Sequence, residues 1–144
     1  MPLKITFYLG LFLFAHQSCL ALTIVPENMG ISFPGTYLSG RGQTAVSNPA
    51  HNQLYVVRFY VEGEPGKKIT VTVPNKQYLN HNKSSRKIKI RRIFYGCGLS
   101  KRGRTKINSN GRSKLLCIGA KIRIGAKIPA GNYSGTIPFE VNYR

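Results

Sequence analysis

Hydrophobic and polar residues alternate with a period of two along most of the chain. Residues 54–62 show the pattern first, and no segment beyond residue 21 carries a helical stripe of apolar positions. One expected face consists of Tyr55, Val57, Phe59 and Val61, and the opposite face of Val56, Arg58 and Tyr60. Because the side chains of a β-strand point alternately to opposite faces, this pattern predicts a strand with one buried face.

A second alternating segment follows a turn. Residues 63–66 read Gly-Glu-Pro-Gly, residue types that favour tight turns. In residues 68–74, the expected inward face is Ile69, Val71 and Val73, and the outward face is Lys68, Thr70 and Thr72. Two alternating segments joined by a short turn predict a β-hairpin of residues 54–62 with residues 68–74.

The next alternating segment changes phase in its middle. Residues 87–90 place isoleucines on one face, and residues 93–95 resume the alternation one position out of step. A β-bulge inserts one extra residue into a strand and shifts the phase by one. The sequence therefore predicts a bulge near Arg91 and Arg92.

Two further strands are expected toward the C-terminus. Residues 120–124 alternate apolar with basic positions, and residues 133–143 form the clearest alternating run. In that run the inward face is Tyr133, Gly135, Ile137, Phe139, Val141 and Tyr143. Pro138 cannot donate to a ladder, so we expect this strand at a sheet edge. The polar, glycine- and serine-bearing segments 80–86 and 99–114 are predicted loops.

About seven short strands separated by glycine and proline predict the fold class. We expect an all-β, immunoglobulin-like antiparallel sandwich that forms a single domain over residues 22–144. We find no internal repeat and no interdomain linker in the sequence.

Residues 1–21 have the composition of a secretory signal peptide. Lys4 precedes an apolar run at residues 5–15, and a polar stretch ends in Ser-Cys-Leu-Ala21. This order predicts export with cleavage after Ala21, to the periplasm or the cell surface. The apolar run is too short to cross a hydrocarbon core of about 30 Å, so an uncleaved anchor is less favoured, and we expect no transmembrane segment in the mature chain.

Composition disfavours an enzyme. The chain has 22 Lys plus Arg, four acidic residues and no Asp, with a formal net charge of +18. Four scattered Glu cannot supply paired-carboxylate hydrolysis or a hard-cation site. Residues 98–105 resemble a phosphate-binding loop but have Arg104 in place of its lysine, and His51 and His81 lie in no catalytic pattern. We expect a non-enzymatic protein without cofactor or metal, with a secreted hydrolase as a minor alternative.

Cys97 and Cys117 remain after cleavage of the signal. In an exported chain an even pair predicts a disulfide, which for a loop of this length contributes about 3 kcal/mol. Two separate buried thiols are the alternative.

The C-terminal segment, residues 120–144, resembles the end of a bacterial family of secreted domains of unknown function, the 4402 type. The matching features are a strand that runs into a Gly-x-Tyr-x-Gly turn and a terminal Val-x-Tyr strand. Residues 59–74, with their Gly-Glu-Pro-Gly turn before a threonine-rich strand, resemble the middle of the same family. The resemblance covers about half of the mature chain.

The same ending also resembles subunits of chaperone-usher fimbriae and the related spore-coat-U-like domains, through Gly131 and the penultimate Tyr143. This resemblance implies an incomplete sandwich whose groove accepts a strand from a periplasmic chaperone, and later from a neighbouring subunit. The implied strand-addition interface is Gly131, Ile137, Phe139, Val141 and Tyr143. The start of the mature chain is short for a donor strand, and the two cysteines lie further from the N-terminus than those of fimbrial subunits usually do. A self-contained sandwich and a terminal subunit are therefore the alternatives to a polymerising subunit.

Residues 67–123 carry 17 of the 22 cations and predict attraction to polyanions. The candidate residues are Lys83, Arg86, Lys87, Lys89, Arg91, Arg92, Lys101, Arg102, Arg104 and Lys106. The alternative function is therefore a secreted cationic protein that binds an anionic polysaccharide, lipid surface or nucleic acid. The competing interpretation is charge that merely keeps the protein soluble.

Overall fold

The computed structural model describes residues 20–33, 37–38 and 40–144, and within them the chain forms ten β-strands and no helix. In chain order the strands are β1 (Thr23–Asn28), β2 (Gln43–Ser47), β3 (Val57–Glu62), β4 (Lys68–Thr72), β5 (Tyr78–His81), β6 (Lys87–Cys97), β7 (Arg104–Lys106), β8 (Leu116–Ile124), β9 (Tyr133–Ser134) and β10 (Glu140–Tyr143). The predicted all-β fold is confirmed. The predicted signal peptide lies outside the described residues except for Leu20 and Ala21, and it stays a prediction.

The larger sheet is built around β8. Its strand order is β1-β3-β8-β6-β5-β9, every pairing is antiparallel, and β2 also pairs with β8. Strand β3 pairs with residues 116–118 of β8 and β2 with residues 120–124, while β6 runs along most of the same length. Because β6 takes one edge of β8, β2 and β3 share the other edge, one behind the other.

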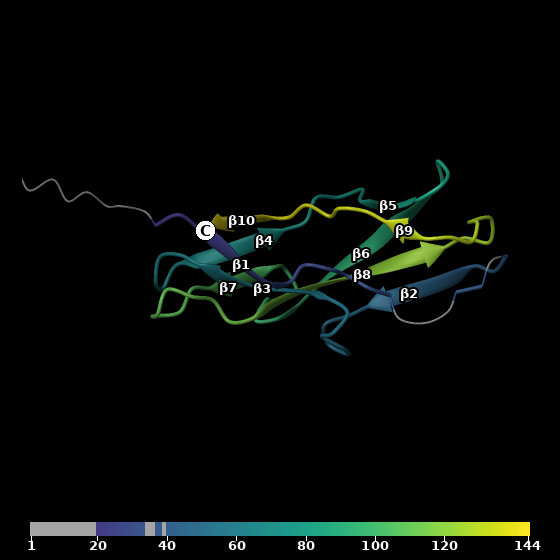
Figure 1. Ribbon diagram of the computed structural model, residues 1–144. Coiled ribbons are helices and arrows are strands. Elements are labelled where there is room, and N and C mark those ends of the chain that lie inside the picture. Colours follow the sequence, from purple (N-terminus) through teal and green to yellow (C-terminus); the bar gives the residue numbers. More distant parts are fainter. Residues whose placement is uncertain (1–19, 34–36, 39) are drawn as a thin grey trace, which may run out of the picture.

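The smaller sheet has the order β10-β4-β7 and lies over one end of the larger one (Figure 1). The two sheets form a curled, sandwich-like arrangement. Figure 1 shows β4, β7, β10 and β1 gathered at one end of an elongated molecule, and β2, β5 and β9 at the other. We call these the closed end and the open end.

Two apolar clusters form the core. The first lies at the closed end and consists of Val57, Phe59, Val61, Ile69, Val71, Val73, Leu99, Ile107, Leu116 and Ile118. The second lies at the open end and consists of Ala45, Ile88, Ile90, Ala120 and Ile122. Ile31, Ile93 and Ile137 are partly buried and pack against both clusters, so they connect the two parts of the core.

Several expectations are confirmed. The isoleucines at 88 and 90 are buried, the register of β6 shifts between Ile90 and Arg92, and Cys97 and Cys117 form a disulfide with Cα atoms 5.4 Å apart. The bulge keeps the apolar residues on the inner face on both sides of the phase change. One continuous strand therefore replaces the two short segments.

The predicted hairpin of residues 54–62 with residues 68–74 is wrong. Strand β3 pairs with β1 and β8, whereas β4 pairs with β10 and β7. The intervening turn does form, with Gly66 at a φ of 80° and Lys67 N–H donating to the Glu64 carbonyl at 3.2 Å. It carries the chain from one sheet to the other. Alternation identifies the buried face of a strand but not its partner, and this is why the pairing was mispredicted.

The predicted strand at residues 133–143 is interrupted. Strand β9 pairs with β5 in the larger sheet and β10 with β4 in the smaller one, while residues 135–139 pair with no strand among the described residues. Both strands lie at sheet edges, and Pro138 lies in the unpaired segment between them, where it leaves no ladder hydrogen bond unmade. The alternation continues through residues 133–143 because every second side chain points toward the core, both in the two strands and where the chain passes from one sheet to the other.

Three boundaries also differ from expectation. Residues 54–56 lie outside β3, and Val56, expected on the same face as Arg58 and Tyr60, is fully buried. The expected loop at 80–86 begins inside β5. The expected loop at 99–114 contains β7, whose pairing with β4 buries Ile107 completely.

Candidate strand-binding cavity and basic surfaces

An apolar cavity of about 790 Å³ lies between the sheets toward the open end. Its floor is the inner face of the larger sheet, where Ile88 and Ile90 of β6 and Ile122 of β8 line it. These residues point inward because they occupy the apolar positions of two alternating strands. The cavity is large enough to hold several apolar side chains at once, since binding pockets for small molecules commonly span about 300–1,000 Å³.

Two unpaired segments form the walls of this cavity. Residues 29–33 follow β1, residues 135–139 lie between β9 and β10, and neither belongs to a strand. Ile31 and Phe33 line the cavity from the first segment. Ser32 N–H donates to the Tyr55 carbonyl at 3.0 Å, which anchors that segment to the body of the protein. The inter-sheet cavity is therefore apolar inside and bounded by main chain without strand partners.

The structure divides the predicted strand-addition interface. Gly131, Ile137 and Phe139 line the inter-sheet cavity, and the Phe139 ring lies 4.9 Å from the ring of Phe59. Val141 and Tyr143 do not line it. They belong to β10, lie opposite Val71 and Ile69 of β4, and pack against the first core cluster.

Tyr143 connects three parts of the closed end. Its hydroxyl accepts a hydrogen bond from the Glu64 backbone N–H at 2.8 Å and donates to the Leu20 carbonyl at 2.6 Å. The ring packs so closely that a Cβ on Gly63 would clash with the Tyr143 hydroxyl. The penultimate aromatic thus secures the β3–β4 turn. Cleavage after Ala21 would remove its contact with Leu20.

Gly131 is required by backbone conformation and by contact. Its φ of 146° is one that other residues rarely adopt, and an added Cβ would clash with the His81 ring. His81 lies 4.9 Å from the ring of Tyr133, its Nδ1 accepts from Lys83 N–H at 3.0 Å, and its Nε2 lies 3.1 Å from the Ala130 carbonyl. These contacts hold the loop before β9 against the end of β5.

The ten polyanion-binding candidates are all exposed, but they form two separate groups. The first group lies on β6 and the loop before it and consists of Lys83, Arg86, Lys87, Lys89, Arg91 and Arg92. The second lies on β7 and the loop before it and consists of Lys101, Arg102, Arg104 and Lys106. Because β6 belongs to the larger sheet and β7 to the smaller one, the two groups lie on different sheets.

Sequence reasoning missed two parts of these sites. Lys121 and Arg123 of β8 join the first basic group, because the register places Lys121 directly opposite Arg92. That information depends on strand pairing and is not visible in the sequence. The wall at residues 29–33 was also missed, although its Met-Gly-Ile-Ser-Phe pattern alternates and could have indicated an inward-facing segment.

The chain matches the family of the domain of unknown function DUF4402 over residues 23–143 and therefore belongs to that family. The resemblance predicted from the C-terminal segment is confirmed at this level. Comparison with curated proteins gives no significant match, and comparison with solved structures gives none either.

Among the described residues, no group of three or more His, Cys, Asp or Glu side chains could hold a metal ion. None of the described segments forms a helix that is long and apolar enough to cross a membrane.

Proposed function

We propose that this protein is a non-enzymatic, exported structural or adhesion-type protein that binds a β-strand of a partner along the inter-sheet cavity. The observation that carries the proposal is the pair of unpaired segments, residues 29–33 and 135–139, on either side of an apolar cavity. An extended peptide between them would gain main-chain hydrogen bonds from the walls and place alternate side chains in the cavity. Main-chain bonds of this kind supply affinity, and the apolar side chains determine register.

The partners proposed for this cavity are a periplasmic chaperone and neighbouring subunits, as in the fimbrial subunits that the C-terminus resembles. Support for export comes from the signal-like composition of residues 1–21. The N-terminal segment of the described chain is already in use, because β1 pairs with β3 from Thr23 to Asn28. A strand in the cavity must therefore come from another molecule, or β1 must first leave its own sheet.

Hydrogen exchange on the processed protein can test the proposal directly. The probe is a synthetic peptide of alternating valine and threonine, and native mass spectrometry reports its stoichiometry. Binding in the cavity should slow exchange at residues 29–33 and 135–139. Slowed exchange confined to the outer edges of β7, β9 or β10 would show that the peptide merely extends a sheet edge, and the proposal would be wrong.

A matched pair of variants sharpens the test. Ile137→Asp places a charge in the inter-sheet cavity and should abolish the added protection, because an unpaired carboxylate in an apolar site is unfavourable. Asn142→Asp adds the same charge at an exposed position of β10, outside the cavity, and this variant should bind the peptide as the parent does. Co-expression with the cognate chaperone should show the same order, with loss of the complex for Ile137→Asp and retention for Asn142→Asp.

A further inference from the structure

The outer face of the larger sheet carries a concentrated array of cations. Strand β6 alternates buried isoleucines with exposed lysines, so Lys87 and Lys89 point away from the cavity. The bulge between Ile90 and Arg92 then exposes two successive arginines instead of one. On the neighbouring strand, Lys121 and Arg123 occupy the outward positions between buried or half-buried residues. We call Lys87, Lys89, Arg91, Arg92, Lys121 and Arg123 the basic face.

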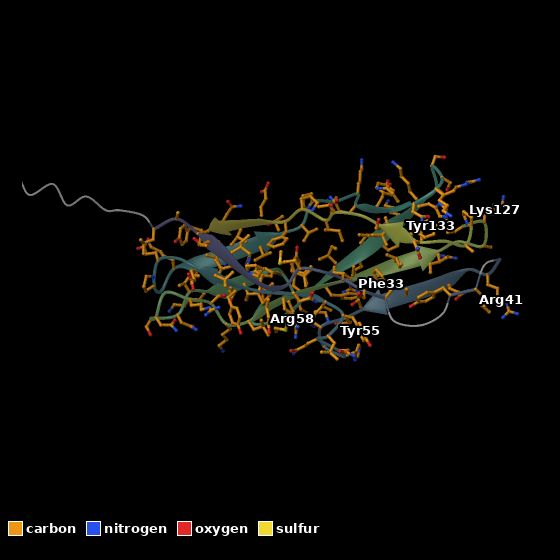
Figure 2. All side chains as sticks on the ribbon, viewed as in Figure 1. Phe33, Arg41, Tyr55, Arg58, Lys127 and Tyr133 are labelled. Carbon is orange, nitrogen blue, oxygen red and sulfur yellow. A yellow bond between two sulfur atoms is a disulfide. The ribbon has the colours of Figure 1, made fainter. Side chains whose placement is uncertain are left out.

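No carboxylate lies on the strands that form this region. The four Glu residues of the chain are Glu27 on β1, Glu62 on β3, Glu64 in the turn after β3, and Glu140 on β10. Three of them lie within 4 Å of a cation, and all four belong to strands or turns of the closed end. The open end therefore carries unneutralised positive charge, which Figure 2 shows continuing to Arg41 and Lys127 at its tip.

The register adds a feature that solubility does not require. Arg92 lies directly opposite Lys121, and like charges in that position destabilise a ladder. A neutral or acidic residue at either place would relieve the repulsion and keep the surface polar. An anion bound between the two side chains would relieve it as well.

The geometry favours a linear polymer that is recognised through its charges. The cations are spread along the face of two adjacent strands, with alternate residues of β6 about 7 Å apart. Base stacking has little to use here, because Arg92 covers the Phe94 ring at 5.0 Å, and the exposed Tyr78, opposite Lys89, is a single ring rather than a row of stacking platforms.

We propose that the basic face is a binding surface for a linear anionic polysaccharide, whose carboxylate or sulfate groups lie along β6 and β8. The basic face occupies the outer side of the sheet whose inner side lines the inter-sheet cavity. The two sites therefore use different residues, and each can be lost without the other.

The test compares two triple variants of the processed protein with the same change in charge. One carries Lys89→Gln, Arg92→Gln and Lys121→Gln on the basic face. The control carries Lys101→Gln, Arg102→Gln and Arg104→Gln on and before β7, all of them exposed. The probe is heparin, in solution and as a column, over a range of NaCl concentrations. We expect affinity to fall about tenfold for the first variant and about threefold or less for the control, because only the first removes contacting charges.

Two outcomes would overturn the proposal. Equal losses in the two variants would leave only the general field of a cationic protein. Tighter binding to single-stranded DNA or to anionic phospholipid vesicles than to heparin, at the same salt concentration, would assign the surface to another class of partner. The single variant Lys121→Gln separates loss of binding from loss of folding. It should weaken heparin binding but raise the thermal midpoint of unfolding, because it removes the repulsion with Arg92. A fall in both would indicate a structural role instead.

Discussion

The closed and open ends of this protein are made of the same kind of strand but differ in the size of the buried core beneath them. At the closed end, two sheets enclose ten buried apolar residues, the disulfide joins β6 to β8, and three ion pairs lie nearby. Within the described part of the open end, five buried residues form the core, and the cavity walls pair with no strand. Under the proposed function, the closed end would maintain the fold and the open end would accept the partner strand.

Matched truncations in the two core clusters should give the largest difference. Ile69 is fully buried at the centre of the closed end, whereas Ile88 is buried but lines the inter-sheet cavity. Ile69→Ala should lower the free energy of unfolding by about 4 kcal/mol and Ile88→Ala by about 2 kcal/mol, since the second site already borders a void and loses fewer packing contacts. Urea denaturation measures both values. Equal losses would mean that the two ends are packed alike.

Removal of the disulfide should destabilise the closed end almost as much. Cys97 and Cys117 are 20 positions apart, and a loop of this length corresponds to about 3 kcal/mol in the chain-entropy treatment. The double variant Cys97→Ala with Cys117→Ala should lose this amount in denaturation, and the parent protein under reducing conditions should show a similar loss. A loss below about 1 kcal/mol would show that β6–β8 pairing alone anchors this end.

The sequence predicted the buried faces of these strands well and their partners poorly. Alternation identified Ile69 and Val71 as buried, and a phase change located the bulge beside Arg92. Both features depend only on the order of residues within one strand. The false hairpin arose because partner choice depends on how sheets stack, which no local pattern contains.

The candidate sites show the same limit. Gly131, Ile137 and Phe139 were predicted on the cavity side, but Val141 and Tyr143 of the same alternating run belong to the closed end. The interruption at residues 135–139 separates them, and it arises because the flanking strands join different sheets. Lys121 became part of the basic face only through its register with β6.

Gly131→Ala should affect the open end selectively. The new Cβ would clash with the His81 ring. The alanine would also have to adopt the Gly131 φ of 146°, and backbone strain of this kind commonly corresponds to about 1–3 kcal/mol. We expect faster hydrogen exchange at the β5 and β9 amides, with little change at β4. Gly125→Ala is the matched control in the same loop, because its Cβ would make only an ordinary contact with Ile128. If the control behaves identically, the loop and not the His81 contact is responsible.

The ion pairs of the closed end should contribute least to the free energy of unfolding. Glu27 and Arg58 approach to 3.9 Å with both side chains partly exposed, and such pairs contribute about 0–1 kcal/mol. Glu27→Gln should therefore lower the free energy of unfolding by less than about 1 kcal/mol at low salt, part of it through repulsion as the net charge rises from +18 to +19. The loss should shrink further in 1 M NaCl, where charges are screened beyond about 3 Å. A loss that is larger than this and persists in high salt would mean that buried charge pairing stabilises the closed end. With the expected small loss, any greater stability of the closed end would have to come from the apolar core and the disulfide.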